Sequence, residues 1–229
     1  MIEGSRRIIH LGLNFMFAPV TIPIDTEQQI KFQGVLSKNQ IAFDQINRTD
    51  KLLTFVSTKG GSLDVRVGLA GPQVSQLLIL SSGQTLPKES FIESADAVCE
   101  AFTEVWQEPK QVIHCDSCLR TLYQVMDKHA FQFLWEQRLK QKEESLNVLN
   151  RAVLGGGLRL VIPPTEDKKT QIEIKIESFL SDSRMLFVEV QFAWKQPFPI
   201  SDGLNPKALI DEIDNFSINE VGQFIKRGV

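Results

Sequence analysis

The sequence lacks the features that mark membrane-spanning and secreted proteins. No stretch approaches the about 18 consecutive apolar residues that a membrane-spanning helix requires. The apolar run near the N-terminus is interrupted by His10, Gly12 and Asn14 and has no small-residue cleavage site behind it, so it predicts a strand rather than a signal peptide. Three cysteines, an odd number, do not make a disulfide framework. We therefore expect a cytoplasmic protein that does not enter a membrane.

Residues suited to catalysis are also few. The chain has three histidines and no Gly-x-Ser-x-Gly motif, which leaves little from which to build a nucleophilic triad. The glycines 155–157 follow a predicted helix and precede a predicted strand, which is the reverse of the order in a phosphate-binding loop. We therefore expect no catalytic residue, no cofactor and no metal site.

The pair Cys115 and Cys118 is the most conspicuous local motif, because a Cys-x-x-Cys pair can be redox-active or can bind zinc. Both roles need a backbone that curls so that the two sulfur atoms point the same way. The surrounding residues alternate like a strand, in which positions three apart face opposite sides. We expect two ordinary thiols that are buried or half-buried.

Composition and charge describe an average folded protein. Of the 229 residues, 42% are hydrophobic and 23% are charged, so the chain can bury a core without disulfides. The formal net charge is −3, and neither half of the chain is basic. Because affinity for nucleic acids comes mainly from Lys and Arg at phosphates, nucleic acid is a disfavoured partner.

The first half of the sequence reads as β-α-β4-α. Its final helix is the clearest, with Pro87 in the first turn and apolar residues at spacings of three and four up to Trp106. Asp25 or Thr26 can cap the earlier helix. The expected elements are strand 7–17, helix 26–39, strands 41–46, 51–57, 62–69 and 75–81, and helix 87–106.

The second half reads as β-α-β3-α. Asn205 followed by Pro206 is a good cap and first residue for its last helix, and Ser217 with Glu220 offers a capping box for a further short helix. The expected elements are strand 111–125, a long helix 129–151, strands 158–162, 170–180 and 184–194, and a helix from 206.

The two halves therefore share a similar order of strands and helices. We predict an α+β protein of two similar halves, 1–110 and 111–229, fused into one continuous unit with antiparallel sheets covered by helices. This element order is similar to the TATA-binding-protein-like fold class, in which an antiparallel sheet curves around helices. The resemblance is one of topology, so no functional residue is carried over from that class.

The predicted helix 129–151 is the best candidate for a partner surface. Its apolar residues Phe131, Trp135 and Leu139 approach a heptad spacing, and the charged residues that follow interrupt the seam. Two interpretations stay open, which are packing of this helix against its own sheet and self-association through it.

These observations favour a non-enzymatic binding or assembly protein with a protein partner or a second copy of itself. The alternative is a small-ligand-binding or hydrolytic protein whose pocket lies between the sheet and the long helix, with His10 or His114 as a polar group inside. A third hypothesis, a saddle that binds nucleic acid, is weakened by the mixed charges of the predicted strands, as in Asp64 and Arg66.

Overall fold

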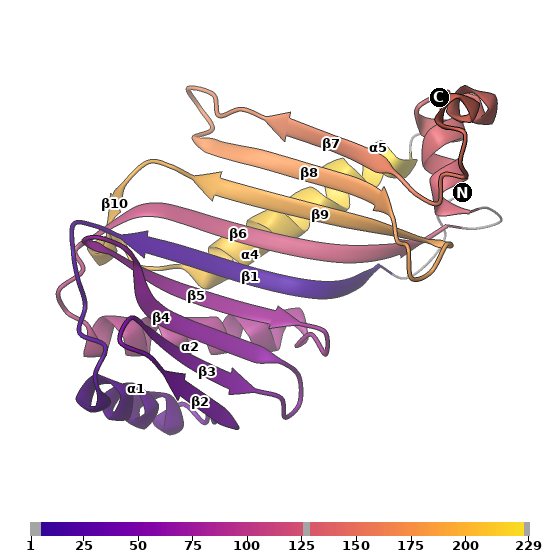
Figure 1. Cartoon of the computed structure of the whole chain (residues 1–229). Helices are drawn as coiled ribbons and strands as arrows, with labels where there is room; N and C mark the ends of the chain where they lie inside the picture. The colour runs from indigo at the N-terminus through magenta and orange to yellow at the C-terminus, as the bar shows by residue number, and fades with distance from the viewer. Residues whose placement is uncertain (1–5, 126–128, 227–229) are drawn as a thin grey trace.

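A single antiparallel sheet dominates the computed structural model, which describes residues 6–125 and 129–226. Its ten strands follow the order β2-β3-β4-β5-β1-β6-β9-β8-β7, and β10 pairs with β6 (Figure 1). A mixed α and β protein with a large antiparallel sheet is thereby confirmed. The strands are β1 (Arg7–Phe17), β2 (Gln45–Arg48), β3 (Leu52–Ser57), β4 (Leu63–Gly71), β5 (Val74–Ser82), β6 (Gln111–Gln124), β7 (Gly157–Ile162), β8 (Thr170–Ser178), β9 (Met185–Trp194) and β10 (Phe198–Pro199).

Helices α2, α4 and α5 lie on one side of the sheet, and the short α3 stands at the end of the sheet near β7 (Figure 1). Asp25 caps α1 by accepting a 2.9 Å hydrogen bond from the amide of Gln28, and Asn205 caps α4 in the same way through Ala208. None of the helices in the described ranges is long and apolar enough to cross a membrane. Their bounds are α1 (Thr26–Lys38), α2 (Lys88–Val105), α3 (Ala130–Gln132), α4 (Pro206–Phe216) and α5 (Gly222–Lys226).

The end of α4 differs from the sequence expectation. A π-helical turn, η4 (Ser217–Val221), runs on from α4 and leads directly into α5. Ser217 is buried, and no side-chain cap stands before η4. The expected capping box at Ser217 and Glu220 is therefore wrong, because the backbone never leaves the helical conformation there.

Alternation along the strands sends one set of side chains into the core. On β1, Leu11, Leu13, Phe15 and Phe17 are fully buried on the side that faces the helices. Phe17 stacks on Phe102 of α2 with 4.9 Å between ring centroids. The hydrophobic effect on this face therefore fixes which side of each strand is covered.

The other face of the sheet is polar and carries paired charges. Glu189 of β9 accepts hydrogen bonds of 2.6 Å from both Arg120 and Lys175. On β4, Arg66 pairs with Asp64 at 2.6 Å. Because opposite charges are neighbours throughout, the face does not present a block of one sign.

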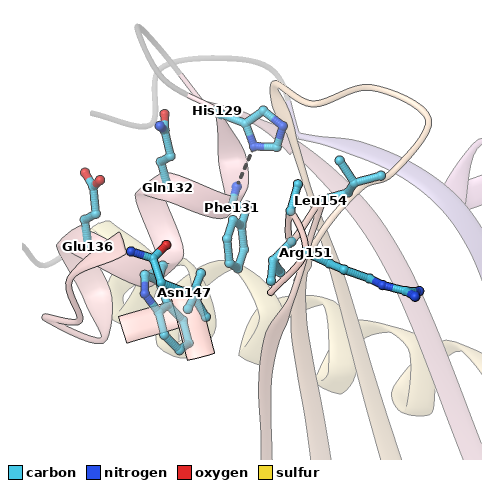
Figure 2. Close-up of a pocket in the computed structure, with 11 residues that line it drawn as sticks. His129, Phe131, Gln132, Glu136, Asn147, Arg151 and Leu154 are labelled. Carbon is cyan, nitrogen blue, oxygen red and sulfur yellow. Dashed lines mark hydrogen bonds between the residues drawn. The ribbon is translucent and has the colours of Figure 1, made fainter. Parts of the chain in front are cut away.

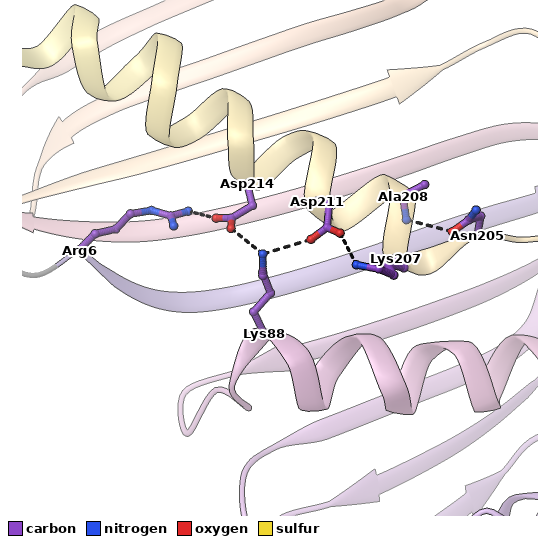
Figure 3. A network of polar contacts seen from close by, with 7 residues as sticks. All are labelled: Arg6, Lys88, Asn205, Lys207, Ala208, Asp211 and Asp214. Carbon is purple, nitrogen blue, oxygen red and sulfur yellow. Dashed lines mark hydrogen bonds and ion pairs between the residues drawn. The ribbon is translucent and has the colours of Figure 1, made fainter.

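The middle of the sheet joins the first part of the chain to the second. Strand β1 pairs with β6 along almost its whole length. On the helix side, Lys88 of α2 contacts Asp211 at 3.1 Å and Asp214 at 3.0 Å, both on α4 (Figure 3). Arg6, just before β1, forms a 2.5 Å ion pair with Asp214. Helices from the first and second parts of the chain are thus linked by charge as well as by the sheet.

The expected long helix over 129–151 is wrong. The chain forms the short α3, a π-helical segment η1 (Phe133–Arg138) and a separate 3-10 segment η2 (Glu143–Leu149). Lys140 has a positive φ of 54°, which ends the helical run. The apolar spacing that suggested one helix therefore continues across a turn.

Candidate interaction edge

Exposed apolar side chains gather around one edge of the sheet. Most of the large ones in the described chain fall between residues 148 and 180, and the others lie scattered, as Ile30 does on α1. The members that lie on β7 or beside its start, which we call the β7 cluster, are Leu154, Leu160, Val161, Ile162 and Leu180. Because folded proteins seldom leave such residues together in water, this cluster is a candidate interaction surface.

Strand β7 is the last strand of the sheet on this side. It pairs with β8, and no other described strand pairs with it (Figure 1). Leu160, Val161 and Ile162 are 37%, 52% and 41% exposed. An edge strand presents a row of unpaired amide and carbonyl groups that another strand can use. Strand β7 therefore combines an open backbone edge with exposed apolar side chains.

The one charge on β7 is already paired. Arg159 donates hydrogen bonds of 2.9 and 2.7 Å to the two carboxylate oxygens of Glu173 on β8. The bond from Arg159 is the main reason that the pKa of Glu173 lies below its usual range. This charge is thus turned toward the neighbouring strand and does little to shield the edge.

Glycine allows β7 to lie close to β8 where the strand begins. A Cβ atom at Gly157 would stand 2.3 Å from the carbonyl oxygen of Ile176, so no larger residue fits there without displacement of the backbone. Next to it, the amide of Ser178 donates a 3.0 Å hydrogen bond to the carbonyl of Gly156. The glycine run 155–157 therefore sets the start and register of the edge strand.

Two residues of the predicted partner surface lie beside the start of β7. The rings of Phe131 and Trp135 stack with 5.9 Å between their centroids, and both line a cavity of about 310 Å³ (Figure 2). A Cβ atom at Gly156 would lie 3.1 Å from the Phe131 ring, so this aromatic pair adjoins the edge. Leu139 is partly exposed and lies outside the lining of this cavity.

The polar groups of that cavity are mixed in character. His129 accepts a 3.1 Å hydrogen bond from the amide of Phe131, as Figure 2 shows. Glu136 and Arg151 also line the cavity, and so does Leu154 of the β7 cluster. This arrangement gives an aromatic hollow at the end of the edge, without a nucleophile positioned next to a base.

A second cavity, of about 620 Å³, lies near the other end of β7. Its lining includes Ile162 and Pro163, the aromatic residues Phe192, Trp194 and Phe216, and several charged side chains. The rings of Phe192 and Phe216 meet edge-on at 5.2 Å. The β7 edge thus runs between two hollows of the surface.

The structure places His10 and His114 on the polar face of the sheet and far apart along it. His114 contacts Asp116 at 2.8 Å, and Asp116 accepts a hydrogen bond from Asn14. His10 is opposite Arg120 in the β1–β6 pairing, and burial followed by the charge of Arg120 lowers its pKa to about 4. Neither histidine lines the two cavities above, which adjoin β7.

Cys115 and Cys118 lie on opposite faces of β6, as three-residue spacing in a strand requires. Burial raises the pKa of Cys118 to about 12 and raises that of Cys115 as well. Across residues 6–125 and 129–226, no group of three or more His, Cys, Asp or Glu side chains is arranged to bind a metal.

Sequence reasoning found the strand 158–162 but missed its importance. The apolar run Leu158–Ile162 is also what a buried strand would show. The signal that could have helped is the number of predicted strands after the first helix of each half, which is four in the first half and three in the second. Within the described part of the chain, the second half adds no strand outside β7.

Comparison with known proteins adds little to this picture. No family model and no curated protein matches the sequence. Among solved structures, the chain is similar to the regulatory subunit of aspartate kinase from Thermus flavus, with 10% identity and a TM-score of 0.25 over 93% of this chain and 98% of that chain. Because this score is too low to indicate a shared fold, no property of that subunit is transferred.

Proposed function

We propose that this chain is a non-enzymatic binding or assembly protein of the cytoplasm that holds a protein partner along the β7 edge. The observation that carries the proposal is the β7 cluster, in which exposed apolar side chains lie on and beside a strand that, among the described strands, is paired on one side only. Addition of a strand to such an edge gives affinity through main-chain hydrogen bonds and specificity through side-chain pockets. The cavities at the two ends of β7 would supply those pockets.

We also infer that the chain arose from two similar halves, 1–110 and 111–229, with a TATA-binding-protein-like topology. The strand order supports this inference. Outward from the central β1–β6 pair, one side runs through β5, β4, β3 and β2, and the other runs through β9, β8 and β7. On each side the strand next to the central pair, β5 or β9, is the last long strand before the final helix of its half. The first half adds four strands outside β1, whereas the second half adds three outside β6 because its fifth strand, β10, pairs with β6, so β7 lies at the edge.

The two alternative functions have weaker support. A ligand-binding or hydrolytic site would need His10 or His114 in a pocket with converging groups, and the two lie apart on the polar face. A nucleic-acid saddle would need a positive sheet face, and Arg120 and Lys175 are both paired with Glu189. The apolar edge remains the feature that best fits a specific role.

Charge placed on the edge tests the proposal. Val161→Lys adds a cation at a half-exposed position of β7, opposite Glu173, whose carboxylate already binds Arg159 and Lys175. Ile30→Lys is the matched control on α1, where the side chain is 62% exposed. We expect proteins that co-purify with the wild-type chain, measured by quantitative mass spectrometry, to fall at least about tenfold with Val161→Lys, since a buried unpaired charge costs several kcal/mol.

The control variant should retain the same proteins. Both variants should keep the wild-type circular dichroism spectrum, which shows that the fold is intact. Equal retention of all co-purifying proteins by Val161→Lys and the wild type would overturn the proposal.

A further inference from the structure

The β7 edge can pair with a second copy of itself. When two antiparallel strands continue one sheet, directly opposite residues have side chains on the same face. On β7, Leu158, Leu160 and Ile162 point to the helix side, and Arg159 and Val161 point to the polar side. When two β7 strands are related by a two-fold axis, one residue must therefore lie directly opposite its own copy. We name each register by that residue.

Three axis positions keep most of the strand paired, and they differ in what they bring together. An axis at Arg159 would set two arginines directly opposite each other, which is unfavourable. An axis at Val161 would leave Leu158 beyond the paired region. An axis at Leu160 sets Leu160 against the partner's Leu160 and Leu158 against the partner's Ile162. The last register alone matches the whole apolar row with itself and keeps like charges apart.

The same register suits the ends of the strand. Gly157 falls opposite the partner's Pro163, and glycine leaves room beside a proline ring. Arg159 falls opposite the partner's Val161 and remains within reach of Glu173 on its own β8, to which it is bonded at 2.7 Å. No buried charge is left without its partner in this arrangement.

We propose that two copies of the chain join through antiparallel β7 strands across a two-fold axis at Leu160, so that the two sheets become one. This inference rests on the proposed function of the edge and names its occupant. The exposed Leu154 and Leu180, at the start of β7, would adjoin the partner's segment after Ile162 and extend the contact beyond the strands. An apolar contact around the strands is needed because a single short strand pair buries less area than a stable dimer requires.

Cysteine cross-linking tests the register. In Leu160→Cys the two introduced side chains are directly opposite, about 4.5 to 5.5 Å apart at Cβ, whereas in Arg159→Cys or Val161→Cys they are diagonal and about 7 to 8 Å apart. In a disulfide the two Cβ atoms are about 3.5 to 4.5 Å apart, so the directly opposite pair needs the smaller movement. Under mild oxidation we expect Leu160→Cys to form covalent dimer at least about tenfold faster than either neighbour.

Two further measurements keep the test decisive. The wild-type chain, whose native thiols are buried or half-buried, should form no covalent dimer. In sedimentation velocity, the wild type should shift from monomer to dimer as its concentration rises, and Leu160→Lys should remain a monomer with an unchanged circular dichroism spectrum.

The possible outcomes separate this inference from the proposed function. A wild type that stays monomeric at all concentrations, or cross-linking that is equal at 159, 160 and 161, overturns the two-fold dimer. If Val161→Lys nevertheless loses a co-purifying protein, the binding edge stands and its occupant is another chain. If substitutions in β7 change neither the self-association of the chain nor the proteins that co-purify with it, both proposals fail.

Discussion

The two outer edges of the sheet are built in contrasting ways. Strand β2 is four residues long, and its exposed positions are polar: Gln45, Asn47 and Arg48. Arg48 also hydrogen-bonds to the Thr26 hydroxyl at the start of α1. Strand β7 is longer, more apolar and bears a single charge that is paired with β8.

This difference shows which edge is protected. Short length and polar side chains are the usual means by which a protein prevents unwanted strand pairing. Strand β2 has both, whereas β7 is longer and has one charged side chain, Arg159, which is bound to Glu173. An exposed apolar edge in a folded protein either promotes aggregation or binds a partner. The adjoining cavities favour the second interpretation.

Among the changes that test this comparison of the two edges, the largest effect on stability should come from substitution of Gly157, where β7 lies against β8. Gly157→Ala places a Cβ against the backbone of Ile176 and should lower the free energy of unfolding by about 2 to 3 kcal/mol. Gly34→Ala, on α1 near the opposite edge, meets nothing within 4 Å and should raise it by about 0.5 to 1 kcal/mol. Urea denaturation measures both. Equal effects of the two changes would show that β7 is not held at Gly157.

An acid titration should report on the centre of the sheet, between the two edges. The pKa of His10 is lowered from 6.5 to about 4, so the unfolded chain binds a proton more readily than the folded chain between these pH values. Stability is therefore lost as pH falls through this window, by about 2 kcal/mol between pH 7 and pH 5.

Substitution of the histidine gives the control for this titration. His10→Gln should remove that part of the pH dependence, as urea denaturation at the two pH values can show. Val161→Lys should retain it, because the edge lies several strands away. An unchanged pH dependence in His10→Gln would contradict the assignment to His10.

The smallest effect on stability is expected from the one charge on the edge. Arg159→Gln removes an ion pair whose arginine is largely exposed, so the free energy of unfolding should not change measurably in urea denaturation. Association through β7 should become several-fold tighter, since the edge is then uncharged, and sedimentation velocity can measure it. Arg48→Gln on β2 is the matched control and should leave association unchanged. Weaker association of Arg159→Gln would show that the arginine contributes to the contact.

Local patterns were sufficient to predict most of the elements. The expected strand 7–17 and the helix after Pro87 agree with β1 and α2 within a residue. Asp25 and Asn205 cap the helices that they were expected to cap. These features depend on interactions between residues close in sequence, so their signal is present in the sequence itself.

The predicted helix 129–151 failed for the opposite reason. Its apolar residues match a helical spacing, yet Val148 and Leu149 are exposed and the chain turns at Lys140. Helical spacing of apolar residues produces a helix only where those residues pack against the rest of the protein. The prediction of Phe131, Trp135 and Leu139 as a partner surface is still untested, and the first two now lie beside the β7 edge.

The sequence by itself determined most of the strands and the capped helices α1 and α4, because alternation and capping are local. Only the tertiary structure decided the order of the strands, and hence that β7 has a single neighbour while β1 and β6 have two or more. That order depends on pairing between residues far apart in the chain, and the same apolar run can serve as a central strand or as an open edge.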